Sequence, residues 1–195
     1  SMRVMRMEIP MNFTMEYFEE QILNLAEATN CSQSCKARIT VFRNDGGLYS
    51  PETNTISFII QTNPIKNANY QLNQSNYEVE LYKDFLVTKQ LLSTIKTTNK
   101  IINVTGSVFA KENDFQNCLL LNTDKNIIEA LNGNIFMLIG NKLITPALSE
   151  GCLNGIIRKQ ILKIAKKIEN IEVIEGVISP FDLQKADELF ITNVI

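Results

Sequence analysis

Histidine is absent from the 195 residues of this sequence. Without an imidazole group, Ser-His-Asp and Cys-His catalysis, His-ligated zinc and imidazole acid–base chemistry are all excluded. Any catalysis must therefore rely on lysine, carboxylates, tyrosine, cysteine, hydroxyl groups or a bound cofactor.

Cysteine is scarce, with four residues in the whole chain. Cys31 and Cys35 have three residues between them, whereas redox and zinc pairs usually have two, and Cys118 and Cys152 each stand alone. We interpret the four thiols as structural groups in a reducing compartment, and we predict no metal site.

Strong charge bias and long apolar runs are also missing. The formal net charge is −2, whereas nucleic-acid and membrane-surface partners need clustered Lys and Arg, so neither partner is expected. No apolar run approaches the roughly 18 residues of a membrane span, and the N-terminus lacks a signal-peptide core. These absences predict a soluble, cytoplasmic protein.

The N-terminal part, residues 1–61, is predicted to form a small α/β domain. Apolar residues at helical spacing indicate a helix over Met15–Ala28, which Thr14 can cap. Strand patterns at residues 38–42 and 55–61 flank an Asn-Asp-Gly-Gly turn and predict a strand pair.

A linker is expected over residues 62–76, which are rich in Asn and Gln and lack a sustained period. Residues 77–195 then predict a second, larger domain. Strands are indicated at residues 77–81, 118–122, 134–139, 142–145, 171–177 and 188–194, and helical patterns at residues 96–111, 156–169 and after Ser179-Pro180. Because strands and helices do not alternate strictly, the expected fold class is α+β.

Three features of the second domain could carry chemistry. The helix expected from Ile156 follows a loop of small residues, and free backbone N–H groups at a helix start bind anions such as phosphate; a plain junction capped by Asn154 is the alternative. Glu129 lies between apolar strand residues, where it is either a buried, paired carboxylate or a solvent-facing one. Lys96, taken alone, is an ordinary surface lysine.

Taken in order, these segments resemble class IV aminotransferases, the fold-type IV enzymes that use pyridoxal phosphate. The matching segments are Lys-Thr-Thr-Asn at 96–99, Cys-Leu-Leu-Leu-Asn at 118–122, Glu129 with Asn-Ile-Phe at 134–136, Leu-Ile-Thr-Pro at 143–146, Leu-Asn-Gly-Ile-Ile-Arg at 153–158 and Ala-Asp-Glu-Leu-Phe-Ile-Thr-Asn at 186–193. Motifs in this order are specific to the family but not to one member. The family includes branched-chain and D-amino-acid aminotransferases and aminodeoxychorismate lyase.

The resemblance implies a two-domain fold and a role for several side chains. Lys96 would form the Schiff base with pyridoxal 5'-phosphate and later move the substrate proton. Glu129 would hold the protonated pyridine nitrogen. Arg38 and Arg43 lie where some relatives place arginines near the substrate.

The resemblance also implies a binding site for the cofactor phosphate. The backbone amides of Gly155, Ile156 and Ile157 would bind it at the helix start. Thr192 and Asn193 fall in a turn that lines the phosphate in relatives.

The implied activity is transfer of an amino group between an amino acid and a 2-oxo acid, in a homodimer. The apolar surface of the first helix, with Tyr17, Phe18, Ile22 and Leu25, is consistent with such an assembly. The alternative within the family is aminodeoxychorismate lyase, which gives 4-aminobenzoate and pyruvate. A non-catalytic protein built on a decayed enzyme is a third hypothesis, which the presence of both Lys96 and Glu129 weighs against.

Departures from the family pattern accompany the resemblance. A phosphate-binding arginine upstream and a segment after Asn193 are missing, so the sequence resembles part of a longer polypeptide. Asn99-Lys100 stands where branched-chain enzymes commonly have tyrosine. Asn154 replaces their usual proline, which favours the D-amino-acid and lyase branches.

Overall fold

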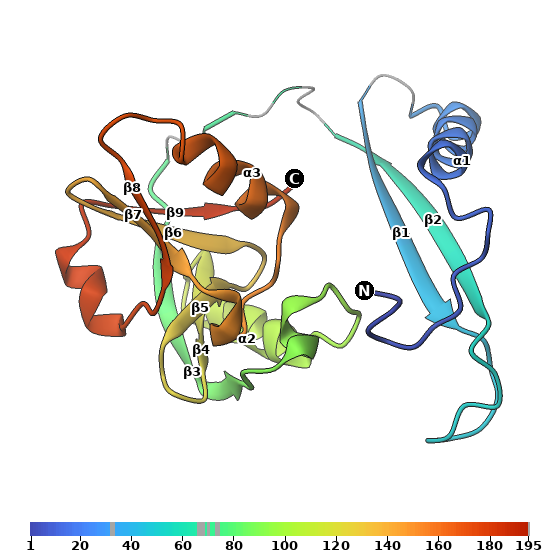
Figure 1. The fold of residues 1–195 in the computed structure, drawn as a ribbon, viewed down its shortest axis with the longest axis horizontal. Helices are drawn as coiled ribbons and strands as arrows, with labels where there is room; N and C mark the ends of the chain where they lie inside the picture. Colours follow the sequence, from blue (N-terminus) through green and yellow to red (C-terminus); the bar gives the residue numbers. More distant parts are fainter. Residues whose placement is uncertain (32–33, 66–68, 70, 73–74, 195) are drawn as a thin grey trace. The chain divides into compact units, whose positions relative to one another are not determined.

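The computed structural model describes residues 1–31, 34–65, 69, 71–72 and 75–194. The chain divides into two compact units, Ser1–Gln74 and Ser75–Ile195 (Figure 1). Among the described residues, no helix is both long enough and apolar enough to cross a membrane.

The first unit pairs one helix with a two-stranded antiparallel sheet. Helix α1 (Met15–Ala28) has the predicted bounds, and Thr14 caps it by accepting a hydrogen bond from the Tyr17 N–H at 3.2 Å. The predicted strand pair is confirmed, although β1 (Cys35–Arg43) and β2 (Ile56–Pro64) are longer than expected. Strand β2 therefore continues into the range 62–76 that was expected to be a linker, and part of that range lies outside the described residues.

Aromatic side chains form the core of this unit. The rings of Phe13, Phe18 and Phe58 meet edge to face with centroids 4.9–5.5 Å apart, which ties α1 to β2. Tyr17 contacts the same cluster. The apolar face of α1 is thus half-buried within the unit rather than fully exposed.

The second unit contains two sheets and confirms the α+β prediction. The first sheet has the order β3-β4-β5, built from β3 (Val79–Val87), β4 (Asn117–Asn122) and β5 (Ile127–Ala130). The second has the order β8-β7-β6-β9, built from β6 (Asn134–Ile139), β7 (Lys142–Pro146), β8 (Glu172–Gly176) and β9 (Glu188–Thr192). Two α-helices and three short 3-10 helices complete it: α2 (Ile101–Glu112), α3 (Ile156–Ala165), η1 (Leu91–Thr94), η2 (Leu148–Glu150) and η3 (Pro180–Lys185).

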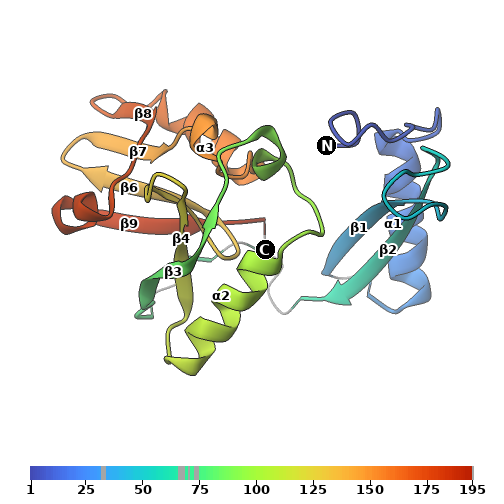
Figure 2. The same ribbon diagram turned by 90° about the horizontal axis from the view of Figure 1, so that it is seen from below.

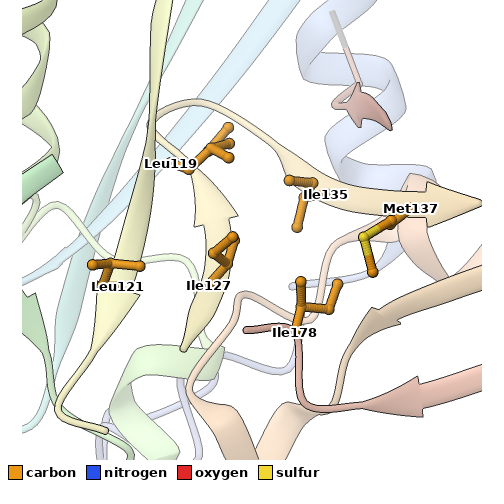
Figure 3. Close-up of a cluster of buried hydrophobic side chains, with 7 residues drawn as sticks. Leu119, Leu121, Ile127, Ile135, Met137 and Ile178 are labelled. Carbon is orange, nitrogen blue, oxygen red and sulfur yellow. The ribbon is translucent and has the colours of Figure 1, made fainter. Parts of the chain in front are cut away.

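Helix α2 lies beside the β3-β4-β5 sheet and α3 beside the β8-β7-β6-β9 sheet (Figure 2). Successive side chains of a strand point to opposite faces of its sheet, so each face belongs to a different layer. Leu119 on β4 and Ile135 on β6 point into the core between the two sheets, which Met137 and Ile178 complete (Figure 3). Their neighbours point the other way, since Leu120 packs toward α2 and Phe136 toward α3. The order of layers is therefore helix, sheet, sheet, helix, and each fully buried side chain of this kind contributes about 1.5–3 kcal/mol.

Both long helices of this unit differ from their predictions. Helix α2 begins at Ile101 rather than Lys96, and Val104 and Val108, whose spacing indicated it, are 57% and 51% exposed. The buried face instead carries Gly106 and Ala110, small residues that let the helix approach the sheet. Helix α3 ends at Ala165, before residue 169, because its last turn tightens into i to i−3 hydrogen bonds.

Candidate functional site

Glu129 lies on β5 with its side chain directed into the unit. It pairs with Leu120 of β4 and is 6% exposed, so the solvent-facing alternative is wrong. Its Oε2 accepts a hydrogen bond from the Leu153 N–H at 2.8 Å, and its Oε1 lies 4.0 Å from the Lys100 Nζ. Burial raises the pKa of Glu129, while the Leu153 N–H and the charges of Lys100 and Lys96 lower it.

Lys96 lies in the irregular segment between η1 and α2, with an exposed side chain. Within the described part of the chain, no hydrogen bond or ion pair holds its ammonium group. Its positive charge nonetheless lowers the pKa of Glu129, so the two groups lie within electrostatic range of each other. The Asn154 N–H donates to the Thr94 carbonyl at 2.9 Å, which ties this segment to the loop before α3.

The start of α3 has the free amides expected of an anion site. Gly155 is the N-cap residue and has no side chain, so the alternative of an Asn154 cap is wrong. The first-turn N–H groups, including those of Ile156 and Ile157, therefore lack a capping side chain. Such a helix start favours a dianion through its partial positive charge.

Asn134 contacts both segments that are expected to bind the phosphate, the start of α3 and the end of β9. It pairs with Thr192 between β6 and β9, and its Nδ2 donates to the Leu153 carbonyl at 2.7 Å. Its Oδ1 packs so closely against Gly155 that a Cβ there would overlap it. Glycine is thus required at this position by the neighbouring amide, before any ligand is considered.

Thr192 and Asn193 end the closing strand beside this position. The Thr192 Oγ1 is buried and has no hydrogen-bond partner within the described residues. The Asn193 Nδ2 donates to the Asn132 carbonyl at 3.3 Å. A buried hydroxyl that lacks a partner favours a ligand with hydrogen-bonding oxygens.

Arg158 anchors the helix that carries the free amides. Its side chain is 2% exposed, and its Nη2 donates to the Pro146 carbonyl at 2.8 Å and to the Glu175 Oε2 at 2.7 Å. These contacts fix the first turn of α3 against β7 and β8. Cys152 lies in the loop before it with a fully buried side chain, and burial raises the pKa of this thiol to about 11, so it stays protonated at neutral pH.

The same loop is held from its other end by Glu150. The Glu150 carboxylate lies 2.9 Å from the Lys89 Nζ and accepts a hydrogen bond from the Asn122 Nδ2 at 2.9 Å. Sequence reasoning assigned no role to Glu150, Asn134 or Arg158. Asn134 and Arg158 at least lie inside matched motifs, whereas Glu150 gave no signal because its partners come from distant turns.

Arg38 and Arg43 belong to the first unit, whereas the other expected site residues belong to the second. Arg38 is exposed on β1. The Arg43 guanidinium donates to the Met5 carbonyl at 2.8 Å and to the Asn54 Oδ1. These contacts give Arg43 a structural role in closing the hairpin of its own unit.

The residues of the second unit fit pyridoxal phosphate. A buried carboxylate can hold a protonated ring nitrogen, and a lysine can bond an aldehyde. The uncapped amides of Ile156 and Ile157 can bind a phosphate, whereas the expected role of the Gly155 amide is not supported, because its N–H donates to the Leu153 carbonyl at 2.9 Å. Among the described residues, no group of three or more Cys, Asp or Glu side chains could hold a metal ion.

The sequence was also compared with models of protein families. The family model for amino-transferase class IV matches residues 1–195. The chain belongs to the class IV aminotransferases. Among curated proteins of this family, a "probable branched-chain-amino-acid aminotransferase" from Thermotoga maritima is 38% identical over 96 residues, which cover 48% of this chain and 35% of the relative.

Solved branched-chain aminotransferases share the fold. A branched-chain aminotransferase from Thermoproteus uzoniensis, solved with norvaline, gives a TM-score of 0.85 at 20% identity, covering 98% of this chain and 63% of its own. The branched-chain enzyme from Thermobaculum terrenum in its PLP form gives a TM-score of 0.82 at 21% identity. The match covers 98% of this chain and 62% of that enzyme. The chain thus spans less than two thirds of the length of these relatives.

Proposed function

We propose that the protein is a pyridoxal-phosphate-dependent aminotransferase that moves an amino group between an amino acid and a 2-oxo acid. The observation that carries the proposal is the buried carboxylate of Glu129. It contacts the loop that leads into the uncapped start of α3 and lies within electrostatic range of Lys96. Membership in the class IV family supports it, as do the activity named for the Thermotoga relative and the PLP form of the Thermobaculum enzyme.

Each residue has a task in this proposal. When bound, pyridoxal phosphate supplies an electron-withdrawing ring that stabilises a carbanion at the substrate α-carbon. Glu129 would hold the proton on the ring nitrogen, and Lys96 would bond the cofactor and move the α-proton. The amides of Ile156 and Ile157 and the hydroxyl of Thr192 would bind the phosphate.

An amino-donor experiment tests this function. Adding a suitable amino acid, such as a branched-chain one, to the cofactor-loaded protein should convert the cofactor to its pyridoxamine form, and a 2-oxo acid should reverse the change. The visible absorbance spectrum reports both half-reactions. Aminodeoxychorismate lyase activity would instead release pyruvate from aminodeoxychorismate without this conversion. A spectrum unchanged by a panel of L- and D-amino acids would contradict the transaminase proposal.

We also propose that the protein is a homodimer. The hairpin of the first unit leaves Phe42 41% and Ile59 52% exposed, in addition to the half-buried face of α1, and such apolar surface is typical of an interface. Light scattering coupled to size exclusion at micromolar concentration should give twice the monomer mass. A monomer that still binds cofactor would refute this assembly.

A further inference from the structure

Lys100 is a cation in a position that disfavours one. It is the N-cap residue of α2, a helix with no acidic residue in its first turn. The helix dipole places partial positive charge there, so an ammonium group at this end is electrostatically unfavourable. Its side chain is only 32% exposed, which shows that it does not simply extend into solvent. A specific partner must offset this placement.

That partner is Glu129. The Lys100 Nζ lies 4.0 Å from the Glu129 Oε1, while the second carboxylate oxygen is already bonded to the Leu153 N–H. The relative position of the two residues is fixed, because the Asn103 Nδ2 in the first turn of α2 donates to the Leu131 carbonyl just after β5 at 2.7 Å. The Lys100–Glu129 ion pair is therefore held in place by contacts between α2 and the residue after β5.

Lys100 is also the cation that remains for Glu129 once the cofactor is in place. Two lysines lower the pKa of this buried carboxyl, Lys100 more strongly than Lys96. In the proposed function Lys96 bonds the cofactor, so it cannot also serve as a lasting counter-ion. Cys152, which also interacts electrostatically with Glu129, keeps its proton at neutral pH and therefore adds no charge beside it.

We propose that Lys100 is a positioning residue, the counter-ion that favours the ionised form of Glu129 and directs this carboxylate toward the ring nitrogen of the cofactor. The inference rests on the proposed function and assigns a task to a lysine outside the residues that touch the cofactor. A buried carboxylate without such a partner would take up a proton and could no longer hold the ring-nitrogen proton.

Titration of the Glu129 carboxyl in the cofactor-free protein tests the pairing. With 13C-labelled glutamate side chains, the NMR signal that disappears in Glu129→Gln identifies this group. Lys100→Met should raise its titration midpoint by about one to two pH units, and Lys100→Arg should restore it. Lys111→Met, on the last turn of the same helix, serves as the matched control and should leave the midpoint unchanged.

A second measurement separates this inference from the proposed function. In the loaded protein, Lys100→Met should shift the pH dependence of the cofactor absorbance, and Lys100→Arg should return it toward the wild-type profile. Failure of the wild-type protein to bind pyridoxal phosphate would refute the proposed function. If the wild type binds it and Lys100→Met changes neither the carboxyl midpoint nor the absorbance profile, the role of Lys100 alone is refuted. A midpoint that moves in Lys96→Met but not in Lys100→Met would likewise assign the counter-ion to Lys96.

Discussion

Replacing Glu129 with glutamine (E129Q) is expected to leave cofactor binding intact but to slow turnover by roughly two to four orders of magnitude. Glutamine has the same shape, and its amide oxygen can still accept the Leu153 N–H that bonds the carboxylate at 2.8 Å. It carries no charge, however, so it cannot keep the ring nitrogen protonated. Single-turnover kinetics of α-proton removal measure the effect directly.

The matched control for E129Q is Glu172→Gln. Glu172 lies on β8 with a side chain that is 55% exposed and 3.8 Å from the Lys142 Nζ, so loss of its charge should not affect turnover. Wild-type rates in E129Q would remove Glu129 from the site. Equal losses of turnover in both variants would indicate a general effect of charge rather than a specific role for the Glu129 carboxylate.

The pH dependence of stability gives an independent readout of the same variant. Because burial raises the pKa of Glu129 above its ordinary value of 4.5, its contribution to stability is fully present below that value. The contribution is lost as the pH rises through the higher folded pKa. E129Q lacks this titration. As the pH rises from 4.5 through the folded pKa, the Tm of the cofactor-free variant should therefore fall less than that of the cofactor-free wild type.

Sequence patterns predicted the elements whose packing is local. Helix α1 has its expected bounds because its cap and its apolar face lie within the helix sequence itself. Helix α2 differs because its buried face is defined by Gly106 and Ala110, which fit against Tyr82 and its neighbours on the sheet. Small residues of this kind carry little hydrophobic signal, so the exposed Val104 and Val108 dominated the pattern.

The candidate site likewise has residues that the sequence predicted and contacts that it did not. Motif order pointed to Lys96 and Glu129, but Glu129 gains its partners from the loop before α3 and from the start of α2. Asn134 contacts the Leu153 carbonyl and Gly155. These contacts depend on the pairing of β6 with β9 and on the position of the loop that leads into α3. These contacts join residues far apart in the sequence, and no local spacing encodes them.

Three lysines around α2 could in principle bond the cofactor, and the structure distinguishes them. Lys111 lies in the last turn of α2, eleven residues after Lys100, which places it about 16 Å away along the helix axis. Lys100 lies 4.0 Å from the Glu129 carboxylate that is proposed to hold the ring nitrogen. A lysine paired with that carboxylate would be occupied as its counter-ion and would not be available to bond the cofactor. Of the two lysines whose charges act on Glu129, Lys96 is the one whose ammonium group has no ion-pair partner in the described part of the chain.

Borohydride reduction of the loaded protein should therefore fix the cofactor to the peptide that contains Lys96, as peptide mapping by mass spectrometry would show. Lys96→Ala should abolish this adduct and lower turnover by at least roughly 10²–10⁴-fold, because the group that moves the α-proton is lost together with the covalent bond. Lys111→Ala is the matched control and should retain both the adduct and the activity. The exposed position of Lys96 means that its removal costs little folding stability, so the variant should unfold at nearly the wild-type temperature. An adduct on Lys100 in the wild-type protein would contradict the assignment of Lys96 and, at the same time, the counter-ion role of Lys100.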